Sequence, residues 1–201
     1  MLVAVVLAAG AGSRFHGPAH KLATPVASDV GTRPLVEHAI VHARDAGIGP
    51  VVVVTGAAEL DLPFELATTV TVVRNPRWAD GQGTSLAAGI DAAGSLGADA
   101  VVVGLGDQPG IPSEAWRRVA LAPTDWPVVV ASYDGRRGPH PVRLHRSIWP
   151  ELASAHDGRD DRDDGARRWM REHPDLVHEV PCPGTAADID TLEDVQRWKS
   201  S

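Results

Sequence analysis

The first twenty-one residues place the strongest limit on how this chain can fold. A valine-rich apolar run over residues 2–7 is followed by the small residues Ala8-Ala9-Gly10-Ala11-Gly12. Such a run is typical of a parallel strand buried on both faces, and the small residues let the backbone turn sharply and approach a ligand closely. Arg14 and Lys21 add two cations. Backbone N–H groups beside two cations predict an anion site, and phosphate is the anion that we expect.

A purely steric interpretation of this turn stays open, because many α/β folds have glycines after their first strand. The segment also matches neither of the two common glycine-rich fingerprints. It lacks the Gly-x-x-x-x-Gly-Lys-Ser/Thr of a P-loop, and Phe15 stands where Gly-x-Gly-x-x-Gly requires its third glycine. Prediction of a phosphate site therefore depends on the neighbouring cations and on the rest of the chain.

Composition narrows the class of protein. A chain of 201 residues with 43% hydrophobic residues suits one packed domain over residues 1–201. A net charge of −7 without a long basic stretch argues against nucleic acid as the partner. The single cysteine, Cys182, excludes an internal disulfide. We find no apolar segment of membrane-spanning length and no signal peptide, so we expect no membrane partner and a cytoplasmic location.

Strand-like and helix-like segments alternate along the chain. Strands are expected at residues 2–7, 51–54, 70–73, 101–103 and 128–131, and helices at 35–47, 85–93, 113–121 and 192–198. Gly47 is expected to end the first helix, Ser113 to cap the third, and Thr191 to cap the last. This alternation predicts an α/β fold with a mainly parallel sheet and helices on both faces. Ligands then bind beyond the carboxyl ends of the strands, which places residues 8–14, Thr55 and the loop after Val103 on one rim.

Carboxylates follow in two places that suit a metal ion. Asp107 comes at the end of an apolar strand, between a glycine and Gln108-Pro109, where Mg²⁺ can bridge a carboxylate to substrate phosphates. A turn aspartate that bonds its own backbone is the alternative. Asp188 and Asp190 flank Ile189 before the last helix. We expect these two aspartates to face opposite ways along an extended segment, with Asp190 in the site as the second metal ligand and Asp188 holding the loop.

Six segments resemble, in the same order, the motifs of the molybdenum-cofactor nucleotidyltransferases. They are Leu7-Ala-Ala-Gly-Ala-Gly-Ser-Arg-Phe15 with Lys21, Trp78–Gly89, Gly106-Asp-Gln-Pro109, His140-Pro-Val142, Asp164-Gly-Ala-Arg167 and Asp188-Ile-Asp-Thr191. The resemblance spans almost the whole chain. Ala9 matches the cytidylyl branch of the family, whose opening is Leu-Ala-Ala-Gly, whereas the guanylyl branch has Leu-Ala-Gly-Gly. Pro139 departs from the family's pattern, which has a glycine before the histidine.

The resemblance implies a three-layer α/β/α fold of the nucleotide-diphospho-sugar transferase type and transfer of CMP from CTP to the terminal phosphate of molybdopterin, with pyrophosphate released. Arg14, Lys21 and Asp107 are the implied catalytic residues, and Mg²⁺ would lie between Asp107 and Asp190. Arg137 and His140 would face the molybdopterin. The implied nucleotide-binding residues are Leu7, Ala8, Ala9, Gly10, Gly12, Ser13, Arg14, Lys21, Thr55, Asn75, Ser85 and Asp107.

Two other functions stay open at this point. One is the same fold acting on GTP or on another phosphorylated acceptor. The other is a non-catalytic carrier of the molybdenum cofactor, or an accessory protein of an oxidoreductase; a molybdoenzyme or its chaperone would then be the partner. The joint presence of Arg14, Lys21, Asp107 and Asp190 favours catalysis, because a carrier has no need of groups that hold pyrophosphate.

Overall fold

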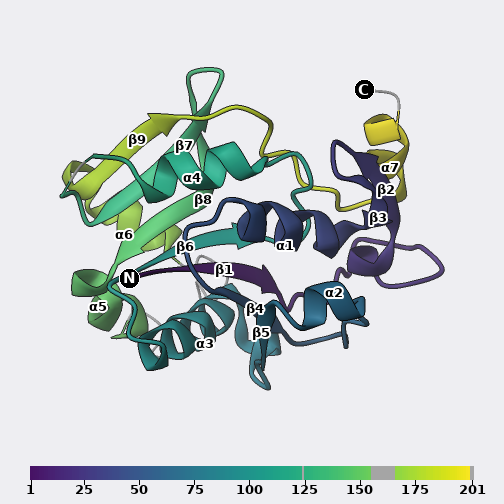
Figure 1. Cartoon of the computed structure of the whole chain (residues 1–201), viewed down its shortest axis with the longest axis horizontal. Coiled ribbons are helices and arrows are strands. Elements are labelled where there is room, and N and C mark those ends of the chain that lie inside the picture. The colour runs from purple at the N-terminus through teal and green to yellow at the C-terminus, as the bar shows by residue number, and fades with distance from the viewer. Residues whose placement is uncertain (124, 155–165, 200–201) are drawn as a thin grey trace.

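The computed structural model describes residues 1–123, 125–154 and 166–199 (Figure 1). In this part of the chain, valine-rich segments form a seven-stranded sheet in the order β5-β4-β1-β6-β8-β7-β9. Strand β8 runs antiparallel to β6 and β7, and the other neighbouring pairs are parallel. The strands are β1 (Leu2–Ala8), β4 (Val51–Thr55), β5 (Val70–Arg74), β6 (Ala100–Leu105), β7 (Val128–Tyr133), β8 (Arg136–His145) and β9 (Val177–Pro181).

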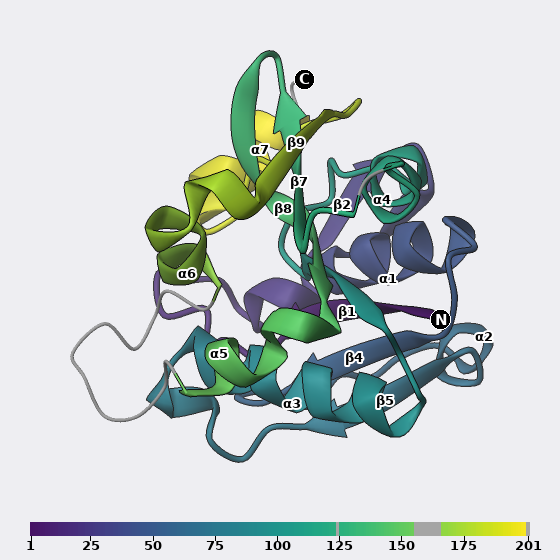
Figure 2. The ribbon, with the colours of Figure 1, turned by 90° about the vertical axis from the view of Figure 1, so that its left-hand side faces the viewer.

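Helices cover both faces of this sheet because its central strands carry apolar side chains on both sides. Figure 2 shows α1 and α4 on one side and α3, α5 and α6 on the other, which makes three layers. Strand β1 contributes Val6 to the first core and Val5 to the second. The helices are α1 (Leu35–Asp45), α2 (Phe64–Ala67), α3 (Gln82–Ser95), α4 (Ser113–Ala120), α5 (Trp149–Ser154), α6 (Arg167–Glu172) and α7 (Leu192–Lys199). The expected three-layer α/β/α architecture is confirmed.

A third, smaller core joins the two ends of the chain. The hairpin of β2 (Pro25–Ser28) and β3 (Gly31–Pro34) lies beside α7 (Figure 1), and Trp198 Nε1 donates to the carbonyl of Ala27 at 2.7 Å. The buried members of this core are Phe15, Val26, Leu35, Ile189 and Val195. It fixes the segment before α7 against the loop after β1, and these are two of the segments singled out from the sequence.

The expected elements are largely confirmed. The predicted strands are β1, β4, β5, β6 and β7, and the predicted helices are α1, α3, α4 and α7. Gly47 does follow α1, at a φ of 65°. Thr191 does cap α7 through Asp194. The capping role of Ser113 was wrong: Pro112 is the N-cap residue, and no side-chain hydrogen bond caps α4.

Three strand regions were not predicted: the β2–β3 hairpin, β8 and β9. Prolines and arginines interrupt the apolar alternation of β8, so its pattern reads as a loop. The ends of β1, β4 and β6 nevertheless meet at one rim, as parallel pairing requires. In the described chain no helix is long and apolar enough to cross a membrane. Asp164 and Gly165 lie outside the described residues.

Candidate active site

A cavity of about 470 Å³ lies at the carboxyl ends of β1 and β6. Its wall is built from the loop after β1, the segment that leads into α3, the residues after β6 and the acidic segment before α7. The residues that line it are Leu7, Ala9, Gly10, Ala11, Gly12, Ser13, Arg14, Lys21, Trp78, Ala79, Gly81, Gln82, Ser85, Leu105, Asp107, Arg167, Asp188 and Asp190. This is the rim at which open α/β sheets bind their ligands.

The loop after β1 turns tightly against the lysine that follows it. Gly12 has a φ of 60°, and the N–H of Phe15 donates to its carbonyl at 2.8 Å. A Cβ at position 12 would lie 3.0 Å from Cγ of Lys21. Any other residue would thus strain the backbone and crowd the lysine stem. Glycine is needed here both for the turn and for the close approach of Lys21.

His20 ties this loop to the short helix that carries Lys21. Its Nε2 is 3.1 Å from the carbonyl of Gly10, and its Nδ1 accepts from the N–H of Leu22 at 3.3 Å. Together these contacts fit a neutral ring protonated at Nε2. The 3₁₀ helix η1 (Lys21–Ala23) begins directly after this ring. His20 therefore holds the glycine loop and Lys21 in one unit.

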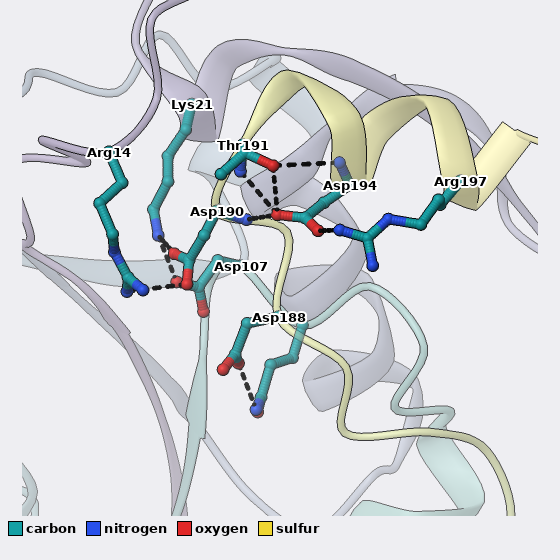
Figure 3. Close-up of polar contacts among 9 residues, drawn as sticks. Arg14, Lys21, Asp107, Asp188, Asp190, Thr191, Asp194 and Arg197 are labelled. Carbon is teal, nitrogen blue, oxygen red and sulfur yellow. Dashed lines mark hydrogen bonds and ion pairs between the residues drawn. The ribbon is translucent and has the colours of Figure 1, made fainter.

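Lys21 bridges two carboxylates. Its Nζ lies 2.6 Å from Asp107 Oδ2 and 2.8 Å from Asp190 Oδ1, and its side chain is only 10% exposed (Figure 3). Burial disfavours the charged ammonium, but the attraction and hydrogen bonds of Asp107 and Asp190 outweigh burial and raise the pKa of Lys21 above 10.5. Lys21 is thus a fixed positive charge between two negative ones.

Arg14 reaches the same acidic group from outside. Its Nη2 is 2.8 Å from Asp190 Oδ2, while 75% of its side chain is exposed. Arg14, Lys21 and Arg167 are the cations of the cavity wall, and Asp107, Asp188 and Asp190 are its anions. Opposite charges are balanced, so the wall is not a strongly positive surface. A triphosphate would bind here best together with a divalent cation.

Backbone and side-chain bonds hold the two acidic segments together. The N–H of Ile189 donates to the carbonyl of Asp107 at 3.0 Å, and the N–H of Thr185 donates to the carbonyl of Gly110 at 2.9 Å. Gln108, which is 1% exposed, donates from Nε2 to Asp188 Oδ1 at 2.7 Å and to the carbonyl of Ala186 at 3.1 Å. The loop after β6 and the segment before α7 thus form one rigid floor.

Asp188 and Asp190 both line the cavity, and the expectation that they face opposite ways was wrong. Residues i and i+2 of an extended segment share a face. Ile189 between them turns the other way into the third core, where it is 2% exposed. Burial, followed by the nearby charge of Asp107, raises the pKa of Asp188 above 3.8. Asp188 also bonds Gln108, so it takes part in both the loop and the site.

The start of α7 fixes the backbone of Asp190. Asp194 Oδ2 accepts from the N–H of Asp190 at 3.1 Å and from the N–H of Thr191 at 2.8 Å (Figure 3). Thr191 Oγ1 in turn accepts from the N–H of Asp194 at 3.2 Å. This reciprocal cap satisfies N–H groups at the helix start. It leaves the Asp190 carboxylate free to bond Lys21 and Arg14.

The acidic side of the cavity fits a divalent metal ion. Asp107 Oδ1 is buried and has no hydrogen-bond partner in the described structure, and a hard cation would satisfy such an oxygen. Asp190 lies across the same ammonium. The described residues contain no group of three ligating side chains that could hold a metal alone. Two carboxylates with substrate phosphates are a typical arrangement for Mg²⁺.

Three predicted nucleotide-binding residues lie behind the cavity wall rather than on it. Ala8, Thr55 and Asn75 are 3%, 6% and 3% exposed and are not among the lining residues. Asn75 Nδ2 donates to Thr84 Oγ1 at 2.9 Å and to Ser85 Oγ at 3.0 Å. It thereby orients Ser85, which does line the cavity. Direct nucleotide contact by these three residues stays a prediction.

The two predicted acceptor-binding residues are not brought together. Arg137 Nε forms an ion pair with Glu179 Oε1 at 2.7 Å, and Arg137 is absent from the lining of the cavity. It lies near the start of β8, in the hairpin with β7. His140 is buried and lines a smaller pocket that adjoins the cavity. The structure thus separates a surface arginine from a buried histidine.

Eight lining residues were not predicted as site residues from the sequence, and four of these carry a polar or aromatic side chain: Trp78, Gln82, Arg167 and Asp188. Trp78 and Gln82 belong to the segment 78–89 that resembles the family, and Arg167 belongs to another such segment. Motif membership was therefore an available signal. Motif membership does not show which of these side chains face the cavity, because the packing of α3 and α6 on the sheet decides that.

Comparison with known proteins agrees with this geometry. The model of the MobA-like NTP transferase domain family matches residues 4–177. The purine catabolism protein PucB of Bacillus subtilis is 29% identical over 205 residues, which cover 96% of this chain and 93% of that protein. The bifunctional protein GlmU of Streptomyces avermitilis is 37% identical over 123 residues, which are 60% of this chain but only 24% of that protein.

Solved structures share the fold over nearly their whole length. A nucleotidyl transferase from Methanothermobacter superposes with a TM-score of 0.77 at 25% identity, covering 100% of this chain and 96% of that one. A Mycobacterium tuberculosis protein in complex with manganese has a TM-score of 0.67 at 24% identity, with 100% and 98% covered. The family match, the full-length fold and the site at the strand ends lead to one conclusion: this chain belongs to the MobA-like NTP transferase family.

Proposed function

We propose that this protein transfers CMP from CTP to the terminal phosphate of molybdopterin and releases pyrophosphate. The observation that carries the proposal is the ammonium of Lys21 beside the glycine loop, with its Nζ 2.6 Å from Asp107 Oδ2 and 2.8 Å from Asp190 Oδ1. This group combines a phosphate-binding cation with two metal-binding carboxylates. A carrier that only holds a cofactor needs neither.

The reaction asks little covalent chemistry of the protein. An oxygen of the acceptor phosphate attacks the α-phosphorus of CTP, the bond from the α-phosphorus to its bridging oxygen breaks, and pyrophosphate leaves with the electron pair. The attacking phosphate oxygen is already ionised, so no general base is required. Positioning and charge neutralisation therefore supply the rate enhancement.

Each part of the cavity has a role in this scheme. The backbone of residues 9–13 approaches the nucleotide, since its small residues line the wall. Arg14 and Lys21 are the cations for the triphosphate and for the charge that develops on pyrophosphate. Asp107 and Asp190 would hold Mg²⁺. When bound, this ion neutralises phosphate charge and makes the α-phosphorus a better electrophile.

The choice of CTP over GTP depends on Ala9 and on the resemblance to the cytidylyl branch. Ala9 lines the cavity and is 4% exposed. A fold neighbour described as an inositol-1-phosphate CTP transferase, from T. maritima, superposes with a TM-score of 0.71 at 16% identity. This likeness concerns the fold alone. Experiment therefore decides between cytosine and guanine as the base of the nucleotide substrate.

Product analysis tests the proposal. Wild-type protein is incubated with molybdopterin, Mg²⁺ and either CTP or GTP, and products are identified by mass spectrometry. We expect the cytosine dinucleotide of molybdopterin from CTP, none from GTP, and none from either nucleotide with Asp107→Asn. A guanine dinucleotide would move the protein to the guanylyl branch. Bound molybdopterin without any dinucleotide would identify a carrier.

A further inference from the structure

Gln108, which directly follows Asp107, is a polar side chain buried behind the cavity. It is 1% exposed and is not among the residues that line the cavity. Its Oε1 is buried and has no hydrogen-bond partner in the described structure. Burying an amide costs free energy unless its polar atoms are bonded. The bonds of Nε2 therefore have to offset this cost.

Both bonds of Gln108 Nε2 reach the segment before α7. Nε2 donates to Asp188 Oδ1 at 2.7 Å and to the carbonyl of Ala186 at 3.1 Å, so its partners lie 80 and 78 positions further along the chain. Because both partners are acceptors, the NH₂ end of the amide has to face them. The bond to Asp188 is charge-assisted, and such bonds are about twice as strong as bonds between neutral groups.

Two backbone bonds flank this side chain. The N–H of Ile189 donates to the carbonyl of Asp107 at 3.0 Å, and the N–H of Thr185 donates to the carbonyl of Gly110 at 2.9 Å. The loop after β6 and the segment before α7 thus run side by side in opposite directions. The backbone bonds do not depend on residue type, whereas the bonds of Gln108 do.

The charges of the cavity oppose this arrangement. Asp107, Asp188 and Asp190 line the same cavity, and like charges repel. Lys21 forms ion pairs with Asp107 and Asp190. No ion pair within the described part of the chain includes Asp188, whose carboxylate instead accepts the N–H of Gln108. The bond from Gln108 therefore helps to keep three carboxylates on two separate segments close together.

We infer that Gln108 is a positioning residue for the two proposed metal ligands, Asp107 and Asp190. It ties the segment before α7 to the loop after β6 and thereby sets how Asp190 faces Asp107. It acts through Asp188 and through the backbone of Ile189, since its own side chain does not reach the cavity. The inference rests on the proposed function for the role of Asp107 and Asp190.

Mn²⁺ binding tests whether Gln108 serves the metal site. Gln108→Met keeps an unbranched side chain of similar length and removes both donors. We expect the dissociation constant of Mn²⁺, measured on the protein alone by electron paramagnetic resonance, to rise about tenfold. Loss of a group that orients metal ligands typically costs about 10–100-fold in metal affinity.

Val119→Ala is the control for a general loss of stability. Val119 is 0% exposed on α4 and does not line the cavity. Its truncation should lower the melting temperature, as Gln108→Met also does, but leave the dissociation constant of Mn²⁺ within twofold of the wild-type value.

Hydrogen exchange of the Ile189 amide measures the connection between the two segments directly. This N–H bonds the carbonyl of Asp107, so it exchanges when the segments separate. In Gln108→Met it should exchange at least about tenfold faster, the effect of one lost hydrogen bond to a charged group, and in Val119→Ala at nearly the wild-type rate. Asp188→Ala breaks the same bond from the other end and should speed this exchange as well, which keeps the test open if Gln108→Met does not fold.

The outcomes separate this inference from the proposed function. If Mn²⁺ affinity and Ile189 exchange change as expected but wild type transfers no CMP, the positioning role stands and the proposed reaction is rejected. If wild type transfers CMP while Gln108→Met keeps the wild-type Mn²⁺ affinity, Gln108 is structural and the inference fails. Unchanged Ile189 exchange in Gln108→Met or Asp188→Ala, or no binding of Mn²⁺ to wild type, also overturns it.

Discussion

Lys21 and Asp107 form an ion pair across 86 positions of sequence, with 2.6 Å between Nζ and Oδ2. The same ammonium bonds Asp190, so one lysine occupies the space between the two carboxylates best placed for a metal. A metal ion held by these two carboxylates would compete with Lys21 for their negative charge. A divalent cation that arrived with a triphosphate would offer Lys21 new anionic partners in exchange.

Lys21→Met removes that competitor. In the absence of nucleotide, we expect the dissociation constant of Mn²⁺ to fall about tenfold, because two carboxylates are left without their internal cation. The affinity for CTP should fall at the same time, since the triphosphate loses a cation. Mn²⁺ binding followed by electron paramagnetic resonance measures the first effect and calorimetry the second. An unchanged Mn²⁺ affinity would mean that the carboxylates are not the metal site.

Asp107→Asn should abolish metal-dependent transfer while the protein stays folded. A carboxylate with a buried, unpartnered oxygen is replaced by a neutral side chain of the same size. We expect turnover to fall by at least about a hundredfold, the size of a lost electrostatic contact in an active site. Thermal unfolding of the variant gives the control. Near-normal turnover at saturating Mg²⁺ would remove Asp107 from the metal site.

Asp190→Asn and Asp188→Asn should separate binding from loop stability. Asp190 holds both Lys21 and Arg14, so its substitution should cut turnover far more than it changes stability. Asp188 bonds Gln108, and asparagine keeps an oxygen for that bond. Its substitution should change the free energy of unfolding by less than about 1 kcal/mol and turnover less than Asp190→Asn does. Urea unfolding and initial rates measured on both variants decide this, and a larger loss of turnover in Asp188→Asn would reverse the assignment.

Acid should destabilise the fold through histidines that are buried in neutral form. Burial lowers the pKa of His38, His42 and His140 below 6.5, and that of His140 to about 3. Below about pH 6.5 these histidines bind protons in the unfolded chain but stay neutral in the native protein. The free energy of unfolding therefore falls as the pH falls toward 3. At pH 5 His140 alone accounts for a loss of about 2 kcal/mol.

Urea unfolding at pH 7 and pH 5 measures this loss. His140→Gln should show a smaller difference between the two pH values than wild type, whereas the exposed His16→Gln serves as control and keeps the wild-type difference. If wild type and His140→Gln lose the same stability between pH 7 and pH 5, His140 does not carry the acid sensitivity.

Much of the fold follows from local sequence patterns. Valine runs define β1, β4 and β6, and parallel strands then bring the loop after β1 and Asp107 to one rim. Strand β8 could not be predicted, because its prolines and arginines mask the alternation that only Val142 and Leu144 retain. It pairs with β6 through tertiary packing, which a local pattern does not encode.

The sequence predicted which segments form the site. It did not predict which side chains of those segments face the cavity, because the packing of the helices decides that. The cluster of Lys21, Asp107 and Asp190 follows from the motifs and from strand order. Asp188 was misjudged because the two-residue period of an extended segment was applied in the wrong sense. The sequence does not show which of Arg167 and Arg137 reaches the cavity. In the structure Arg167, at the start of α6, lines the cavity, whereas Arg137 forms an ion pair with Glu179 on the surface.

Pyrophosphate release tests the central claim most directly. Wild type and Asp107→Asn are assayed with CTP, GTP, ATP and UTP in Mg²⁺, each with and without molybdopterin. We predict release by wild type that requires molybdopterin, is fastest with CTP and is lost in Asp107→Asn. Equal rates with and without molybdopterin, or no release with any nucleotide, would contradict the assignment of this cavity to nucleotidyl transfer onto that acceptor.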